Sequence, residues 1–80
     1  MMETKETVLD ILEEITGTDE VRENPDLDLF GEGILDSLGV VQFLVELEAR
    51  CGVSVPASEF DRSRWATPRD IADRAAEWAQ

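Results

Sequence analysis

A serine, Ser37, follows an aspartate, Asp36, at the point where a loop gives way to a long apolar stretch. Asp36 is a favourable helix N-cap, so Ser37 falls in the first turn with a hydroxyl that capping does not require. The start of a helix also favours a phosphate, because backbone N–H groups and the helix dipole face it. We therefore expect Ser37 to be exposed and to be modified by another enzyme.

The residues that would turn Ser37 into a catalyst are missing. General acids and bases near neutral pH are most often histidines, and the sequence contains none. The single lysine, Lys5, lies near the N-terminus, far along the chain from Ser37. Close carboxylate pairs are inevitable among 19 acidic side chains in 80 residues, so we do not interpret such pairs as catalytic. The chain is interpreted as a substrate of enzymes and not as an enzyme.

Metal and disulfide chemistry also finds little support. The lone cysteine, Cys51, cannot form an internal disulfide, and we interpret it as a small buried hydrophobe in a reducing compartment. Asp26, Asp28 and Gly31 mimic the start of a calcium-binding loop, but Phe30 occupies a ligand position. No metal site is expected.

The net charge and the hydropathy of the chain exclude some classes of partner and indicate a cellular compartment. A net charge of −12 argues against nucleic acid and anionic lipid, because both demand a basic face. No apolar stretch is long enough to span a bilayer, and the acid-rich first residues are unlike a signal peptide. We expect a cytoplasmic monomer with no membrane insertion, whose protein partners carry positive patches. The length suits one domain over residues 1–80.

The hydrophobic spacing predicts an all-α bundle of three longer helices and one short helix. The longer helices are expected over residues 4–16, from Asp36 to Cys51, and from Thr67 onwards. The short helical turn is expected over residues 58–62, with Phe60 pointing inward. In the last helix one stripe is expected to face the core, namely Ile71, Ala72, Ala75, Trp78 and Ala79.

A long ordered loop is predicted over residues 18–35, between the first two longer helices. The periodicity breaks there around Asn24, Pro25, Gly31 and Gly33. Three apolar residues are expected to pin this loop to the core, namely Leu27, Leu29 and Phe30. Trp65 is also assigned to the core, because a tryptophan is rarely left exposed in so small a domain.

The helix that follows Asp36 carries two apolar stripes when residues are placed about 100° apart. The first stripe is assigned to the core and contains Val40, Phe43, Leu44, Leu47 and Cys51. The second stripe contains Leu38, Val41, Val45 and Ala49. Either the helix is buried on both sides, or the second stripe is exposed and serves as a docking surface. We favour docking, and we interpret Gly39 in the first turn as room for a partner's backbone.

The sequence resembles the carrier-protein family, whose small helical domains carry acyl groups as thioesters on a phosphopantetheine arm attached to the serine of an Asp-Ser-Leu motif. Asp36-Ser37-Leu38 matches that motif, and the resemblance covers nearly the whole chain. It is closest to the D-alanyl carrier branch, through Asn24-Pro25-Asp26-Leu27-Asp28-Leu29-Phe30, Glu32-Gly33-Ile34-Leu35-Asp36-Ser37, Val53-Ser54-Val55-Pro56, Ser58-Glu59-Phe60-Asp61-Arg62 and Trp65-Ala66-Thr67-Pro68.

The resemblance implies 4′-phosphopantetheine on Ser37, supplied from coenzyme A by a phosphopantetheinyl transferase. A D-alanine–carrier ligase would load the arm in an ATP-dependent reaction, and a membrane-bound O-acyltransferase system would pass D-alanine to teichoic acids of the cell wall. Leu38, Val41 and Val45 match the face that the family uses for partners, and we add Glu48 beside them. Asp36 completes the motif.

Two other interpretations fit the same residues. The five arginines after Leu38 and the C-terminal Trp78 are unlike the lysine-rich members of that branch, and they leave open an aminoacyl or peptidyl carrier of a natural-product pathway. A different class of function is an acidic helical adaptor that docks through the stripe beginning at Leu38, with no prosthetic group. The adaptor predicts that Ser37→Ala is silent.

Overall fold

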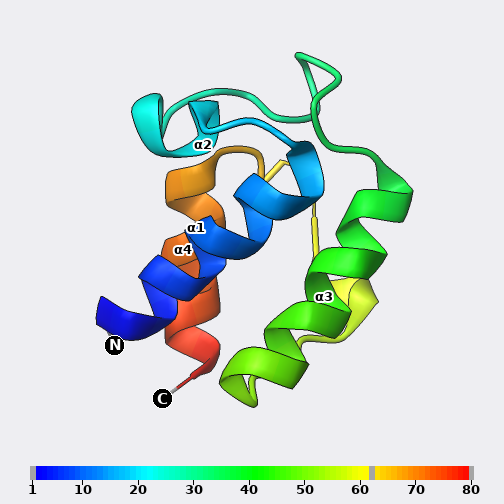
Figure 1. Cartoon of the computed structure of the whole chain (residues 1–80). Coiled ribbons are helices and arrows are strands. Elements are labelled where there is room, and N and C mark those ends of the chain that lie inside the picture. Colours follow the sequence, from blue (N-terminus) through cyan, green and yellow to red (C-terminus); the bar gives the residue numbers. More distant parts are fainter. Residues whose placement is uncertain (1, 62, 80) are drawn as a thin grey trace.

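The computed structural model describes residues 2–61 and 63–79, and this part of the chain is helical without strands (Figure 1). Three longer helices confirm the predicted all-α class. The elements in chain order are α1 (Met2–Thr16), α2 (Glu20–Glu23), α3 (Ser37–Cys51), the 3₁₀ turn η1 (Ala57–Glu59) and α4 (Pro68–Trp78). None of these helices is long and apolar enough to cross a membrane.

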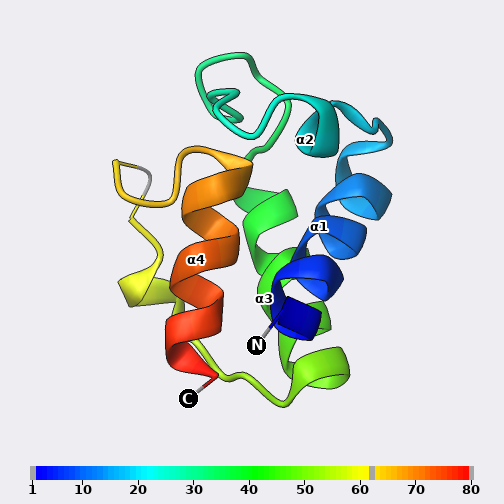
Figure 2. The ribbon, with the colours of Figure 1, turned by 90° about the vertical axis from the view of Figure 1, so that its left-hand side faces the viewer.

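Helix α1 packs against both of the other long helices, α3 and α4 (Figures 1 and 2). The loop that leads to α3 crosses one end of the bundle, and η1 lies beside α3. The core is apolar and draws on all three long helices: Val8, Ile11 and Leu12 from α1, Phe43 and Leu47 from α3, and Ile71 and Ala75 from α4. Burying these faces holds the helices together.

Glycines end the first two long helices. Gly17 (φ 73°) and Gly52 (φ 68°) adopt left-handed backbone angles that side-chain-bearing residues rarely tolerate. The Gly52 N–H donates to the Glu48 carbonyl at 2.9 Å, which closes the last turn of α3. The chain can therefore reverse direction after each helix.

Helix α4 begins as predicted and buries a slightly different face. The Thr67 hydroxyl accepts a hydrogen bond from the Asp70 N–H at 3.1 Å, and Pro68 occupies the first turn. The expectation that Trp78 faces the core is wrong, since 44% of it is exposed. The buried face centres on Ala72 and Ala75 and extends to Ala76, so Trp78 lies about 90° from its middle.

The loop between α1 and α3 is ordered, but it is not a loop throughout. It contains α2, which the sequence reading missed because four residues are too few for a periodic pattern. The side chain of Val21 is fully buried and packs α2 against the core. Leu29 is fully buried and its N–H donates to the Ala66 carbonyl at 2.9 Å, which confirms that the loop is pinned. Leu27 and Phe30 pack against the same core.

The predicted short turn is displaced towards the N-terminus. It spans Ala57–Glu59 as η1 instead of residues 58–62, and Arg62 lies outside the described residues. Phe60 packs inward as expected and forms edge contacts with Phe30 and Phe43, with ring centroids 6.1 and 6.2 Å away. Its ring also covers Trp65, which is buried as predicted. This aromatic group fixes η1 beside α3.

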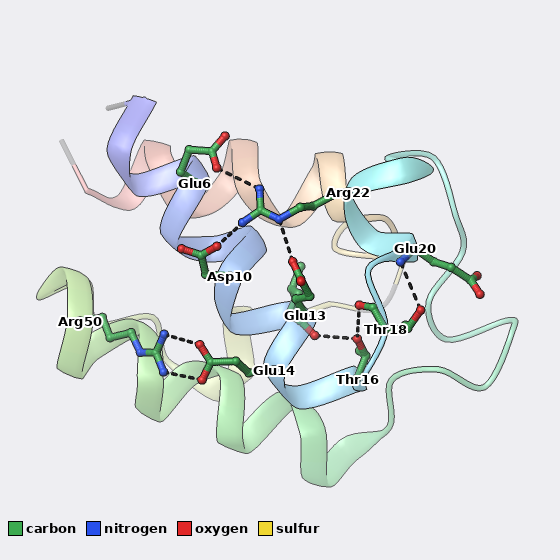
Figure 3. Close-up of polar contacts among 10 residues, drawn as sticks. Glu6, Asp10, Glu13, Glu14, Thr16, Thr18, Glu20, Arg22 and Arg50 are labelled. Carbon is green, nitrogen blue, oxygen red and sulfur yellow. Dashed lines mark hydrogen bonds and ion pairs between the residues drawn. The ribbon is translucent and has the colours of Figure 1, made fainter.

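One arginine anchors α2 to α1. The Arg22 guanidinium pairs with Glu6 at 2.9 Å, with Glu13 at 2.7 Å and with Asp10 (Figure 3). Hydrogen bonds to Glu6 and Glu13 raise the pKa of Arg22 above its ordinary value. Because like charges on one helix face repel, this guanidinium relieves the repulsion while it holds α2 in place.

Candidate functional site

The chain enters α3 through a tight, hydrogen-bonded turn. The N–H groups of Ile34 and Leu35 both donate to the Leu29 carbonyl, at 2.9 and 3.0 Å. Gly33 permits this turn with a positive φ of 71°. Leu35 is buried, so the residue that immediately precedes the Asp-Ser pair is fixed to the core. The position of Ser37 is therefore defined by the fold.

Asp36 is the N-cap of α3, as predicted. Its backbone is extended, and its carboxylate accepts a hydrogen bond from the Gly39 N–H at 2.8 Å. The Val40 N–H donates to the Asp36 carbonyl at 3.0 Å, which begins the helical pattern. Ser37 is the first residue of α3 and is exposed, which confirms the expected presentation at a helix start.

Gly39 serves the packing of the helix and not the approach of a partner. It is buried, and a Cβ at this position would lie 2.7 Å from Leu35 Cδ1 and 3.5 Å from Ile15 Cγ2. The expectation of an open site for a partner's backbone is therefore wrong. A small residue here lets the first turn of α3 sit close to α1 and to the loop.

An apolar ridge runs along the outward side of α3, formed by Leu38, Val41 and Val45. These residues are exposed by 66%, 54% and 61%, respectively. On the opposite side, Phe43 and Leu47 are fully buried. The alternative of a helix buried on both sides is therefore wrong. Contiguous exposed apolar residues on a small protein are typical of an interaction surface.

Two grooves flank this ridge. The groove on the α1 side has a volume of about 440 Å³ and is lined by Glu14, Ile15, Val41, Gln42, Val45, Glu46 and Arg50. The groove on the η1 side has a volume of about 270 Å³ and is lined by Val41, Leu44, Val45, Glu48, Ser54, Val55 and Ala57. Val41 and Val45 belong to both walls. The ridge therefore separates the two grooves. The α1-side groove is lined by three charged residues, and the η1-side groove by one.

The α1-side groove contains a charge network that is already balanced. The Arg50 guanidinium binds both carboxylate oxygens of Glu14, at 2.7 and 2.8 Å (Figure 3). It also binds Glu46 at 2.9 Å. The hydrogen bond from Arg50 holds the pKa of Glu14 below its usual range. The bond to Glu14 also raises the pKa of Arg50. This network ties α1 to α3 beside the ridge.

The predicted site residues lie together on one helix. Five of them belong to α3 and are exposed, namely Ser37, Leu38, Val41, Val45 and Glu48. Among the residues that the structure describes, no cation forms an ion pair with Glu48. The structure thus places Ser37 at the start of α3, directly before the exposed ridge.

Several residues of the grooves escaped sequence reasoning. Leu44 was assigned to the core and is only half-buried, and it lines the η1-side groove. Cys51, also assigned to the core, is half-buried. The Glu46–Arg50 spacing of four residues signalled an ion pair, but the participation of Glu14 depends on how α1 packs.

The residues that mimic a calcium loop have local partners. The Asp28 carboxylate accepts a hydrogen bond from the Gly31 N–H at 2.9 Å, and Asp26 pairs with Arg69 at 3.4 Å. These contacts tie the loop to itself and to α4. They therefore account for both carboxylates as parts of the loop's structure.

Comparison with known proteins agrees with this geometry. Residues 6–75 match the family described as phosphopantetheine attachment site. The D-alanyl carrier protein of Enterococcus faecalis is 60% identical over 70 residues, which cover 88% of this chain and 90% of that protein. The D-alanyl carrier protein of Bacillus velezensis is 50% identical over 76 residues, covering 95% and 97%. That of Listeria innocua is 57% identical over 70 residues, covering 88% and 90%.

Proposed function

The chain belongs to the phosphopantetheine-bearing carrier proteins, in the D-alanyl carrier branch, and on this premise we propose that Ser37 is the attachment residue and that D-alanine is the cargo. The observation that carries the proposal is the position of Ser37. It is the exposed first residue of a 15-residue helix, directly before the exposed ridge. A group attached there stands at the edge of the surface where a partner would dock.

The residues around Ser37 fit a phosphate-linked group. The N-terminus of α3 carries the positive end of the helix dipole, which favours the negative charge of a phosphodiester. The Asp36 carboxylate is held by the Gly39 N–H, so its role is to fix the first turn. The phosphopantetheine arm supplies a thiol on which D-alanine is held as a thioester. The chain itself contributes attachment, position and recognition, while its partner enzymes catalyse.

The exposed ridge of α3 and membership of the D-alanyl carrier branch support a proposal about the partner enzymes. We propose that a phosphopantetheinyl transferase, a D-alanine–carrier ligase and a membrane-bound O-acyltransferase each recognise the ridge of Leu38, Val41 and Val45, with Glu48 beside it. The final acceptor would be a teichoic acid of the cell wall. The net charge of −12 supports long-range steering towards positive patches on these enzymes.

The proposed function also implies an oligomeric state and a cellular compartment. We propose that residues 1–80 act as one carrier domain, monomeric and cytoplasmic, which approaches the membrane enzyme without inserting into the bilayer. Neither nucleic acid nor a second copy of the chain is required. An exposed ridge serves such a shuttle, because each partner must bind and release the same face in turn.

The test is loading by a ligase. Protein bearing the arm would be incubated with ATP, a D-alanine–carrier ligase and D-alanine, and its intact mass would be measured before and after hydroxylamine treatment. We expect a gain of one alanyl group that hydroxylamine removes, because hydroxylamine cleaves thioesters. Loading by another amino acid but not by D-alanine, each with its cognate ligase, would move the protein to a natural-product pathway.

A further inference from the structure

The ridge is too small to form a docking surface alone. Its three side chains, Leu38, Val41 and Val45, span about 10 Å along α3 at the helical rise per residue. A standard protein interface buries about 800 Å² on each partner and draws on about 20–30 residues from each. A partner that docks on the ridge therefore also covers at least one of the flanks beside it.

The flank on the α1 side is a groove between two long helices. Ile15 contributes the apolar part of its α1 wall and is half-buried against the core. Val41, Gln42 and Val45 contribute its α3 wall. Its volume of about 440 Å³ is larger than the volume of about 270 Å³ of the η1-side groove. The α1-side groove is therefore an apolar depression into which a side chain of a partner can insert.

One ion pair holds the two walls of this groove together. The Arg50 guanidinium of α3 binds both carboxylate oxygens of Glu14 of α1, at 2.7 and 2.8 Å (Figure 3). A bidentate pair fixes orientation as well as distance, so the walls are positioned before a partner arrives, and such preorganisation lowers the cost of binding. A cationic side chain in the groove would compete with Arg50 for these oxygens. An uncharged, apolar side chain is the occupant that fits.

The two flanks of the ridge differ in charge. Helix α1 carries five acidic residues and one lysine, and it remains negative even when Arg22 and Arg50 are counted with it. Residues 54–65, on the η1 side, carry two acidic residues and two arginines. A positive patch on a partner is therefore attracted to the α1 flank and gains nothing from the other flank.

We infer that the docking face extends from the ridge onto α1, where the enzyme that loads the arm inserts an apolar side chain into the α1-side groove and lays a positive patch over α1. The inserted side chain lies between Ile15 and Val45. This inference rests on the proposed function. Glu14 and Arg50 are positioning residues, because they hold the two walls of the groove in place.

The first experiment locates the contact by NMR cross-saturation. Deuterated carrier with protonated, ¹³C-labelled Ile, Leu and Val methyl groups would be mixed, without ATP, with a fully protonated D-alanine–carrier ligase that loads it. Irradiating the ligase attenuates the carrier methyl signals that lie at the interface. We expect the attenuation at Ile15 to be at least half of that at Val45. We expect none at Leu9, a half-buried residue that lines a groove on the α4 side of α1.

The outcomes separate this inference from the proposed function. Attenuation at Val45 without attenuation at Ile15 would overturn the inference and leave docking on the ridge intact. Equal attenuation at Leu9 and Ile15 would overturn it as well, because the signal would then not report the α1-side groove. A ligase that fails to load the wild type with D-alanine, although it loads its own carrier, would overturn the proposed function and the inference with it.

Matched variants test the positioning role of the ion pair. Glu14→Gln breaks the pair beside the ridge, whereas Asp73→Asn breaks the pair between Lys5 and Asp73 (2.9 Å), which ties α1 to α4. Each variant removes one charge and one exposed ion pair of α1. We expect Glu14→Gln to raise the KM of the ligase for the carrier about threefold at unchanged kcat, and Asp73→Asn to change neither. An unchanged KM for Glu14→Gln, or equal increases in both variants, would contradict the positioning role.

Discussion

The two faces of α3 are both apolar, but one is buried in the core and the other is exposed to solvent. Phe43 and Leu47 face inward and are fully buried, whereas Leu38 and Val45 face outward and are exposed by 66% and 61%. A small bundle needs only one apolar face of each helix for its core. The outward face therefore adds little to the fold, and its exposed apolar surface supports the proposal that partners dock there.

The largest expected effect on stability comes from truncating the inward face. Phe43→Ala should lower the free energy of unfolding by about 3–5 kcal/mol, because it removes buried ring contacts and leaves a cavity. Val41→Ala on the outward face is the matched control and should change it by less than about 0.5 kcal/mol. Urea denaturation followed by circular dichroism measures both. Similar losses in the two variants would contradict the division of α3 into a core face and a docking face.

A smaller effect is expected at the junction between the faces. Asp36→Ala removes the acceptor for the Gly39 N–H and should cost about 1 kcal/mol of unfolding free energy. Asp36→Asn preserves a capping oxygen and should retain most of that stability. Thermal unfolding of the three proteins tests the assignment. If both variants lose the same stability, the charge of Asp36 matters more than its capping bond.

Altering the outward face should separate function from stability. Val45→Glu should change the free energy of unfolding by less than about 0.5 kcal/mol, because the side chain is exposed. Its kcat/KM as a substrate of the ligase should nevertheless fall tenfold or more, as expected for a central apolar contact. Asn24→Asp adds the same charge in the loop and serves as control. Normal loading of Val45→Glu would show that the ridge is not the docking face.

The smallest expected effect concerns the charge network at the ridge's edge, and it depends on pH. Because Arg50 lowers the pKa of Glu14 in the folded state, the pair stabilises the fold above the ordinary carboxyl pKa. This contribution disappears as the pH falls through the lowered pKa. Wild type should therefore be slightly more stable than Glu14→Gln at pH 7 and equal to it in acid, by urea denaturation. A difference that grows in acid would contradict the pairing.

Much of this contrast could be predicted from the residues alone. Three features of α3 depend on local residue spacing, which can be read directly from a sequence. They are the cap at Asp36, the helix end at Gly52 and the outward stripe that starts at Leu38. Thr67 and Pro68 marked the start of α4 in the same way. The exposure of Ser37 followed from these local signals.

The features that sequence analysis missed depend on packing between distant segments. The pair between Glu14 and Arg50 joins residues 36 positions apart, and the wall of the η1-side groove comes from the segment after α3. Trp78 satisfies the helical spacing of a core residue, but the buried face of α4 is rotated towards Ala76. Helix α2 is too short to produce a periodic signal.

We propose that the outward face of α3 begins at an attachment residue, Ser37. The most direct measurement is the intact mass of the wild type and of Ser37→Ala after incubation with coenzyme A and a broad-specificity phosphopantetheinyl transferase. We predict a gain of one phosphopantetheine group on the wild type and none on Ser37→Ala. If neither protein gains mass while a known carrier does in parallel, the carrier function is contradicted and the ridge belongs to an adaptor without a prosthetic group.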